Sequence, residues 1–343
     1  MQKPVLRFNK NGKFRVLMIS DIHAKANCSP KVTRGIEALL EETKPDFVMI
    51  GGDQCLLRDD INEMRDYFCR IIEPILTRNL PWGSLFGNHD RERNNGIDLV
   101  EEEAMYETIP GCLMERGPED IHGVGNYRLS VYASDGSDEV KYNLWTLDSH
   151  RHIWDFFRKY SSDGTPTKVL PSHFNDGENG GTPLFNQVMW YYTESQRLEK
   201  EAGRKIPGIM FMHIPLPEYL EIIRNPEECG AIGSKRSTTD GSEISSGLFL
   251  AAVERGDIKG IYFGHEHLTD IQGVYAGITM ACDAAIGYDM SGHDDLRGGR
   301  LIDLYEDGRM QTRTVKLMDI MGKEAMRNPD FFEGGCSYFI RKL

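Results

Sequence analysis

Short apolar runs alternate with amphipathic stretches through the first 90 residues of the chain. Residues 14–20, 46–50 and 82–86 are mostly apolar, which is typical of strands buried on both faces. Residues 30–42 and 60–78, which lie between these runs, carry apolar side chains at helical spacing. Strands that alternate with helices in this way predict a parallel sheet covered by helices.

The pattern changes in the second part of the chain. Residues 127–132 and 140–147 run apolar or alternate around a Ser/Asp/Gly turn, which predicts a hairpin. Residues 184–202 and 248–255 have helical spacing. Further strands are predicted at residues 207–214, 258–263, 272–282, 300–305 and 310–317.

One domain of the α/β class, with two packed sheets and outer helices, is the simplest arrangement of these elements. The chain of 343 residues is long enough for it, and shows no repeat or linker. We expect residues 1–317 to form this domain and residues 318–343 to be a tail packed on it. The irregular segments 164–181 and 225–246 are expected to be lids or walls of a substrate site.

Composition narrows the class of function and the compartment. The net charge of -13 argues against a general nucleic-acid binder, because neutralising phosphates needs clustered Lys and Arg. The seven cysteines are scattered, with no CxxC pair, which indicates reduced thiols in a cytoplasmic protein. We expect no signal peptide and no membrane partner, because no segment has the necessary apolar run.

Five polar clusters directly follow predicted buried strands. In α/β folds the carboxyl ends of strands are where ligand-binding groups collect. The clusters are Asp21-Ile22-His23, Gly52-Asp53, Gly87-Asn88-His89-Asp90, His213 and His265-Glu266-His267. Their order and spacing predict that they meet at one site.

Each cluster also has a structural interpretation when it is taken alone. Asp21 could start a turn, Asp53 could cap a helix, and His213 could be a satisfied core residue. Taken together, the clusters offer the carboxylate, amide and imidazole groups that two metal ions need. The candidate ligands are Asp21, His23, Asp53, Asn88, His213, His265 and His267.

Two residues of the third cluster have a different predicted role. His89 is a candidate proton donor or charge stabiliser near a substrate. Asp90 is expected to accept a hydrogen bond from the His89 imidazole and to orient it. The competing interpretation is a plain turn that contains a satisfied histidine.

The order of these motifs resembles the calcineurin-like metallophosphoesterase superfamily. The segments FMHIPLPEY (211–219), LWTLDS (144–149) and SGLFLAAVERGDIKGIYFGHEH (246–267) are similar to the purple-acid-phosphatase-like proteins of plants and fungi. The resemblance covers roughly residues 14–317 and leaves the tail outside. It implies a four-layer αββα fold, a two-sheet β-sandwich flanked by helices.

The resemblance also implies a role for each ligand. Asp21, His23 and His267 would hold one metal ion, Asn88, His213 and His265 would hold the other, and Asp53 would bridge both. His89 would face the leaving group or the phosphoryl oxygens, with Asp90 behind it. The expected cofactors are two divalent ions, Mn, Fe or Zn.

One position departs from the purple acid phosphatases. Those enzymes have a tyrosine three positions after the bridging aspartate, and its phenolate binds ferric iron. Leu56 stands there in this chain, so we expect no charge-transfer band from a tyrosine bound to Fe(III).

The expected reaction is hydrolysis of a phosphomonoester by a hydroxide that bridges two cations about 3.5–4 Å apart. A phosphodiesterase with the same metal core is the alternative, and a non-catalytic scaffold, which predicts lost ligands, is the third hypothesis. The expected substrate is a phosphorylated small molecule or a phosphoprotein. Arg91, which directly follows the third cluster, is the first candidate for a substrate contact. Further candidates are His150, His152, Lys235, Arg236 and Tyr288, for which packing or solvation is the competing interpretation.

Overall fold

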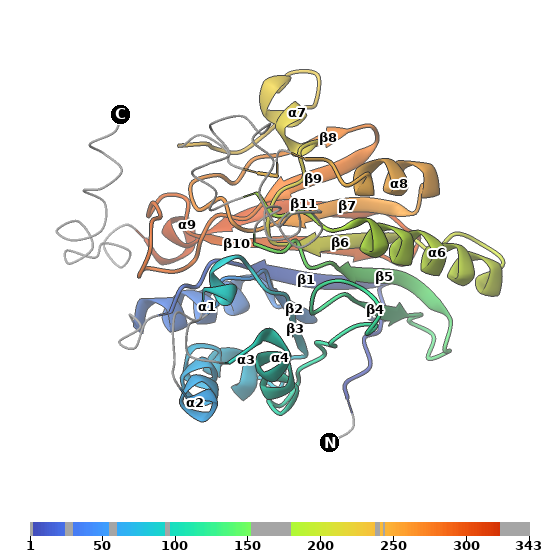
Figure 1. The fold of residues 1–343 in the computed structure, drawn as a ribbon. Coiled ribbons are helices and arrows are strands. Elements are labelled where there is room, and N and C mark those ends of the chain that lie inside the picture. The colour runs from blue at the N-terminus through green and yellow to red at the C-terminus, as the bar shows by residue number, and fades with distance from the viewer. Residues whose placement is uncertain are drawn as a thin grey trace, which may run out of the picture.

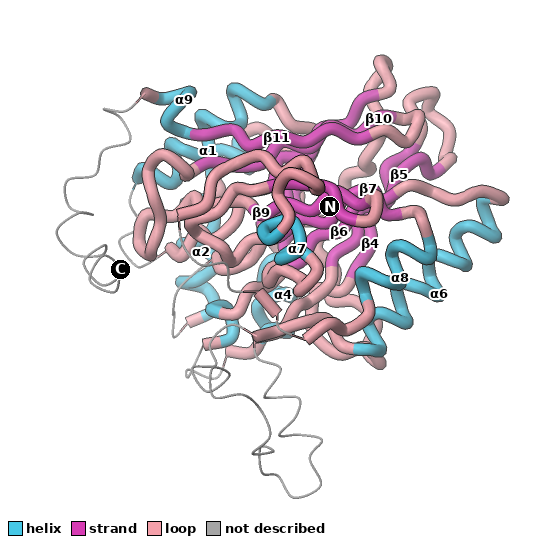
Figure 2. Tube along the Cα trace, turned by 90° about the horizontal axis from the view of Figure 1, so that it is seen from above, coloured by secondary structure: helices cyan, strands magenta, loops and turns pink. Residues whose placement is uncertain are grey.

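Two β-sheets lie between outer helices in the computed structural model (Figures 1 and 2). The structure describes residues 3–24, 30–54, 60–92, 97–151, 180–236, 241–242 and 244–322. Helices α1 to α4 lie on the side of the first sheet, and α6, α7 and α8 lie on the side of the second (Figure 1). The predicted two-sheet α/β architecture is therefore confirmed.

The first sheet has five strands in the order β11–β10–β1–β2–β3. Strands β1, β2 and β3 are parallel, as predicted, and β10 pairs antiparallel with both β1 and β11. The strands are β1 (Lys13–Ile19), β2 (Phe47–Ile50), β3 (Trp82–Ser84), β10 (Gly298–Tyr305) and β11 (Met310–Lys316).

The helices on this side depart from the prediction in two places. The single helix predicted at 60–78 is broken into α2 (Ile61–Ile71) and α3 (Glu73–Thr77), because Pro74 lacks an N–H and crowds the preceding turn. Helix α4 (Leu99–Glu107) was not predicted, although Asp98 and Glu101 form a capping box at its start. Helix α1 (Pro30–Thr43) matches the predicted one.

The second sheet has six strands in the order β4–β5–β6–β7–β9–β8. Strands β5, β6, β7 and β9 are parallel, and β4 and β8 are antiparallel edge strands. The strands are β4 (Tyr127–Tyr132), β5 (Val140–Thr146), β6 (Gly208–Met212), β7 (Ile258–Phe263), β8 (Gln272–Tyr275) and β9 (Ile278–Cys282). The strand predicted at 272–282 is thus a hairpin, which turns at Ala276 and Gly277, both with positive φ.

Strand β6 shows how the core is divided. Ile209 and Phe211 belong to the apolar cluster that includes the first sheet, whereas Met210 and Met212 belong to the cluster under α6 and α8. Successive side chains of a strand point to opposite faces, so a fully apolar run serves both clusters. The outer helices here are α6 (Phe185–Ala202), α7 (Tyr219–Arg224) and α8 (Leu248–Arg255).

Several predictions concern segments near the edges of the described structure. Most of the predicted loop 164–181 lies outside the described residues. Part of the segment 225–246 lies along β8, where Ile232 pairs with Gln272. Helix α9 (Leu317–Met321) packs on α1. Residues 323–343 of the predicted tail lie outside the described residues, so the domain boundary at residue 317 stays a prediction. None of the described helices is both long and apolar enough to span a membrane.

Candidate metal centre

The predicted ligands gather where the carboxyl ends of both sets of parallel strands meet. Asp21 and His23 follow β1, Asp53 follows β2, Asn88 follows β3, His213 follows β6, and His265 and His267 follow β7. The two sheets are joined here, since His213 Nδ1 lies 2.7 Å from the carbonyl oxygen of Gly51. The architecture therefore brings together residues that are more than 240 positions apart in the chain.

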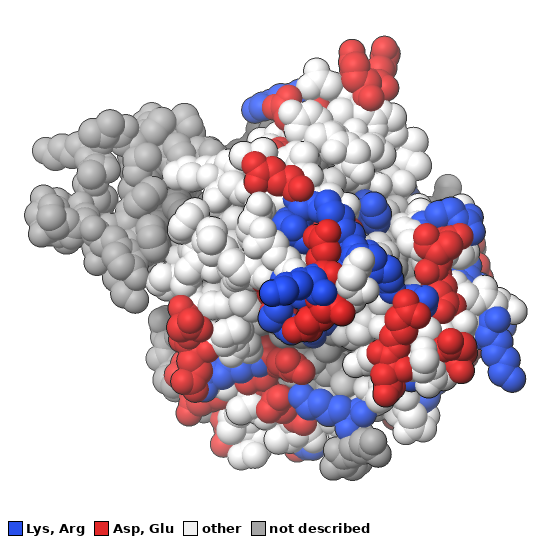
Figure 3. Space-filling model, turned by 90° about the vertical axis from the view of Figure 1, so that its right-hand side faces the viewer, with Lys and Arg blue, Asp and Glu red and all other residues white. Residues whose placement is uncertain are grey.

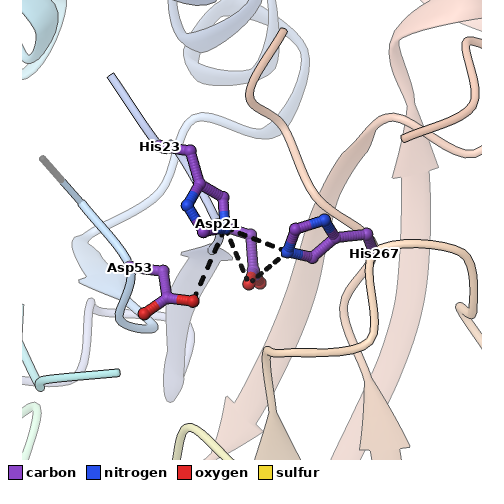
Figure 4. A group of neighbouring side chains, drawn as sticks. All are labelled: Asp21, His23, Asp53 and His267. Carbon is purple, nitrogen blue, oxygen red and sulfur yellow. Dashed lines mark hydrogen bonds and ion pairs between the residues drawn. The ribbon is translucent and has the colours of Figure 1, made fainter. Parts of the chain in front are cut away.

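The first group consists of Asp21, His23, Asp53 and His267, whose side chains point toward one another (Figure 4). One ligand atom from each lies within 4.8 Å of the others. The Nε2 atoms of His23 and His267 are 2.9 Å apart, and His267 Nε2 lies 3.1 Å from Asp21 Oδ1. Two carboxylates and two imidazoles around one small space are a suitable set for a divalent cation.

The second group consists of Asn88, His213 and His265, and it shares Asp53 with the first. Asp53 Oδ2 lies 3.1 Å from His213 Nε2 and 3.5 Å from His23 Nε2. The ring of His265 lies next to that of His213, with the ring centroids 5.3 Å apart. His265 Nδ1 lies 2.9 Å from Asn88 Oδ1. Asp53 thus stands between the groups, as a bridging ligand would.

Buried polar atoms without partners test whether these residues fit metal ions. Among the described residues, His23 Nδ1, Asp53 Oδ2, Asn88 Nδ2 and His213 Nε2 are buried and have no hydrogen-bond partner. Leaving such atoms unpaired is costly in a folded protein, and cations would satisfy the carboxylate oxygen and the imidazole nitrogen Nε2. The donor set and its unpaired atoms therefore fit bound divalent ions.

The carboxylates and His265 are already in the protonation states that metal binding requires, whereas His213 is not. Burial raises the pKa of Asp21 and of Asp53, but nearby imidazoles, His213 first, hold both pKa values below their usual range. Burial and the charge of His213 lower the pKa of His265 to about 3, so its imidazole is neutral. Burial lowers the pKa of His213, but Asp53 and Asp21 outweigh it and raise this pKa to about 10. A cation bound at His213 would therefore displace a proton.

The backbone at the site is strained. Asp21, His23, Asp53 and His265 have φ values of 55°, 47°, 53° and 69°. This left-handed region costs a residue with a side chain about 1–2 kcal/mol. Strain that recurs at four candidate ligands indicates a site held in place by the surrounding fold.

Two glycines allow the loops to approach closely. A Cβ atom at Gly52 would lie 2.5 Å from His213 Nδ1, and one at Gly87 would lie 2.1 Å from Asp53 Oδ1. Both distances are too short for any side chain, so the Gly-Asp and Gly-Asn-His-Asp motifs need glycine for packing.

His89 stands at the edge of the first group. Its ring centroid is 5.1 Å from that of His23, and its backbone N–H donates to Asp53 Oδ1. Its Nδ1 lies 2.7 Å from Glu92 Oε2, so the carboxylate beside the imidazole belongs to Glu92.

Asp90 has a different place from the predicted one. It is buried, and its carboxylate accepts from the backbone N–H groups of Asp53, Gln54 and Gly87 at 2.8–3.0 Å. The reason is local, because His89–Arg91 form one turn of 3-10 helix, which brings residue i+3, not i+1, beside the imidazole. Asp90 therefore ties the loops after β2 and β3 together instead of orienting His89.

The candidates for substrate contacts fall into different settings. Arg91 forms an ion pair with the buried Asp148, which also accepts from the backbone of Val124 and His150. His150 is itself bonded to Gln187. Arg91 is thus an anchored side chain, and its predicted contact with substrate stays a prediction.

The remaining candidates have structural partners or lie outside the described residues. Tyr288 stacks under the Arg297 guanidinium, 4.3 Å from ring centroid to Cζ, and Arg236 pairs with Asp295. The backbone of Lys235 forms an isolated antiparallel β-bridge with that of Thr269. His152 and Leu56 lie outside the described residues, so the departure at Leu56 is not placed.

Sequence reasoning missed two residues that contact the predicted site. Ser291 accepts from His267 Nδ1 through its carbonyl oxygen or its hydroxyl, at 2.8 and 2.7 Å, and so orients the imidazole of this candidate ligand. Nothing local in the sequence marks Ser291. Glu92 was also missed, although its position three residues after His89 was a usable signal.

Comparison with known proteins agrees with this geometry. The family model described as calcineurin-like phosphoesterase matches residues 14–268. "Probable inactive purple acid phosphatase 14" of Arabidopsis thaliana is 27% identical over 316 residues, which cover 82% of this chain and 73% of that protein. "Phosphatase DCR2" of Saccharomyces cerevisiae is 25% identical over 288 residues, which cover 77% of this chain and 46% of that protein.

Solved structures show the same fold at low sequence identity. A dimetal phosphatase from Danio rerio superposes with a TM-score of 0.54 at 13% identity, and covers 89% of this chain and 96% of its own. GAP50, the anchor in the inner membrane complex of Plasmodium, gives a TM-score of 0.50 at 11% identity, with 90% and 86% covered. The neighbours thus support the architecture, and the family match decides the classification: this chain belongs to the calcineurin-like phosphoesterase family.

Proposed function

We propose that this protein is a phosphoric ester hydrolase that uses two divalent metal ions. The observation that carries the proposal is the position of Asp53 Oδ2, 3.5 Å from His23 Nε2 and 3.1 Å from His213 Nε2. When bound, two such ions lower the pKa of a water molecule and polarise a phosphoryl group.

The chain's own residues would bind and orient the reactants. Asp21, His23 and His267 would hold one ion, Asn88, His213 and His265 the other, and Asp53 both. His89, held through Nδ1 by Glu92, keeps Nε2 to donate a proton or a hydrogen bond to a phosphate oxygen. The four imidazoles among the ligands suit Mn, Fe or Zn.

A non-catalytic role is the main competing function, because some relatives are named probable inactive phosphatases. A scaffold that has lost its metals should also have lost ligands. In this chain all seven candidate ligands are present and lie together at the strand ends. This complete set supports catalysis over a scaffold.

The proposed substrate is a phosphomonoester, carried by a small molecule or a phosphoprotein. Charged side chains of both signs are interspersed on the face seen in Figure 3. Exposed charges also pair with each other, as in Arg197–Glu201 and Arg204–Glu139. This distribution and the net charge of -13 support no general nucleic-acid binding. Free thiols at Cys69, Cys112, Cys229 and Cys282 support a cytoplasmic location.

The test is hydrolysis of p-nitrophenyl phosphate and bis-p-nitrophenyl phosphate by protein stripped of metal and reloaded with Mn, Zn or Fe. Bound metal would be counted by mass spectrometry in the same samples. Metal-dependent turnover of the monoester supports the proposal, and preference for the diester would favour a phosphodiesterase. If the reloaded protein binds no metal and hydrolyses neither ester, the catalytic proposal is rejected and the scaffold is favoured.

A further inference from the structure

A three-residue chain of contacts extends away from the metal centre behind His89. His89 Nδ1 lies 2.7 Å from Glu92 Oε2, and the other oxygen, Glu92 Oε1, accepts from Arg151 Nη2 at 2.7 Å. The three side chains are 21%, 29% and 28% exposed, so the contacts are partly shielded from water. None of the predicted metal ligands takes part in these contacts.

The order of the contacts has a chemical consequence for His89. A neutral imidazole carries its proton on one of two nitrogens, and a carboxylate at Nδ1 selects the Nδ1–H form. It also restricts rotation of the ring. Nε2 is then the nitrogen available to a ligand at the metal centre, where the ring lies 5.1 Å from that of His23.

Arg151 acts on the carboxylate rather than on the imidazole. Among the described residues, His89 contacts one oxygen of Glu92 and Arg151 the other, so the carboxylate is held from both sides. Charge-assisted hydrogen bonds of this length are among the stronger ones in proteins. Arg151 therefore restrains the carboxylate that restrains His89.

The contacts also connect two parts of the fold. Glu92 follows the short helix η1 (His89–Arg91) after β3, whereas Arg151 lies after β5 in the other sheet. The neighbouring pair Arg91–Asp148 links the same two segments with the charges reversed. Two adjacent ion pairs thus fix the His89 turn against the end of β5.

From these contacts we propose that Glu92 is the positioning residue for His89, and that Arg151 positions Glu92. The proposal rests on the proposed phosphoesterase function, since it gives His89 its role at the substrate. It predicts that Glu92 influences turnover only through His89.

A double-mutant cycle tests this dependence. Glu92→Gln is expected to lower kcat about 10- to 100-fold, as loss of a carboxylate behind a functional histidine does, with metal content and KM retained. In a His89→Ala background the same substitution should have no further effect on kcat. Independent, multiplicative losses would overturn the proposal.

Matched variants separate positioning from general damage. Glu139→Gln removes a carboxylate from surface ion pairs with Lys141 and Arg204, before β5 and away from the site, and should leave kcat unchanged. Arg151→Gln should lower kcat in the same direction as Glu92→Gln but less. An equal loss in Glu139→Gln would mean that any lost ion pair is harmful, which would overturn the specific role of Glu92.

A second readout needs no activity. Nitrogen NMR of the metal-free protein, at a pH where His89 is neutral, should show the proton on Nδ1 in the native chain. In Glu92→Gln the spectrum should shift toward the Nε2–H form. An unchanged tautomer overturns the proposal, whereas a shift in a protein that hydrolyses no ester supports the positioning role and rejects only the proposed function.

Discussion

Two buried polar clusters of this protein differ in how their groups are paired. Near the start of β7, the Asp257 carboxylate accepts from Tyr191 Oη and Ser195 Oγ, both at 2.6 Å, and Arg255 Nε donates to Ser195 Oγ. At the candidate metal centre, Asp53 Oδ2 and His213 Nε2 are buried and face each other at 3.1 Å as an ion pair, but neither has a hydrogen-bond partner among the described residues. A cluster whose polar atoms are hydrogen-bonded stabilises the fold by itself, whereas buried polar atoms that lack hydrogen bonds become more favourable when a ligand binds them.

The backbone supports the same distinction. Four of the eight described non-glycine residues with positive φ are candidate ligands, and Asp257, Tyr191 and Ser195 are not among the eight. Strain and unpaired polar atoms therefore coincide at the candidate metal centre and are absent from the Asp257 cluster. This difference distinguishes a functional cluster from a structural one in a single chain.

The largest expected effect comes from Asp53→Asn, which removes the charge shared by both ligand groups. We expect turnover to fall on the order of 10³-fold or more, because several kcal/mol of transition-state stabilisation depend on the ions. Metal counting and steady-state kinetics measure this together. Retention of two ions with native turnover would show that Asp53 does not bridge.

His89→Ala should separate catalysis from metal binding. Turnover should fall about 10²- to 10⁴-fold, the usual contribution of a positioned acid or base, while metal content stays native. Loss of metal together with activity would instead place His89 among the ligands.

Asp257→Ala should lower the stability of the fold and leave catalysis and metal binding intact. It leaves the buried Tyr191 and Ser195 hydroxyls without their acceptor, so the free energy of unfolding should fall by about 3 kcal/mol. Urea denaturation measures this fall, and the metal content and turnover of the folded protein should not change. A drop in metal content in the folded variant would contradict the separation of the two clusters.

Glu103 sharpens the comparison, because it is a buried carboxylate outside both clusters. Its Oε1 has no hydrogen-bond partner in the part of the chain that the structure describes, and burial, with the charge of Glu107, raises its pKa from 4.5 to about 7. No imidazole contributes, in contrast to Asp53, whose pKa is lowered. An unpaired oxygen alone therefore does not make a metal site; neighbouring imidazoles do.

The raised pKa predicts a pH-dependent effect of Glu103→Gln. The native state binds the proton of Glu103 more tightly than the unfolded state, so native stability falls as pH rises from about 4.5 to about 7. Above pH 7 the variant should be more stable than the native protein by up to about 3 kcal/mol, since each unit of the pKa difference corresponds to about 1.4 kcal/mol. Urea denaturation across this range should show the difference vanish below about pH 4.5, and a constant difference would contradict the assignment.

Sequence patterns predicted elements where the apolar period was clear. Strand β2 is a fully apolar run, β1 and β7 are mostly apolar, and α1 has one apolar stripe, so local spacing was enough. Helix α4 was missed because Glu102 and Glu103 occupy buried positions and obscure its apolar face. The capping box at Asp98 and Glu101 was the local signal that remained.

The sequence by itself determined which residue types follow each strand, and hence the candidate ligands and the class of chemistry. Only the tertiary structure decided which of them meet. The 2.9 Å between His23 and His267 depends on the packing of two sheets, and no local pattern encodes a distance across 244 positions. The exchange of Asp90 for Glu92 beside His89 depends on one 3-10 turn, whose geometry sets which side chains share a face.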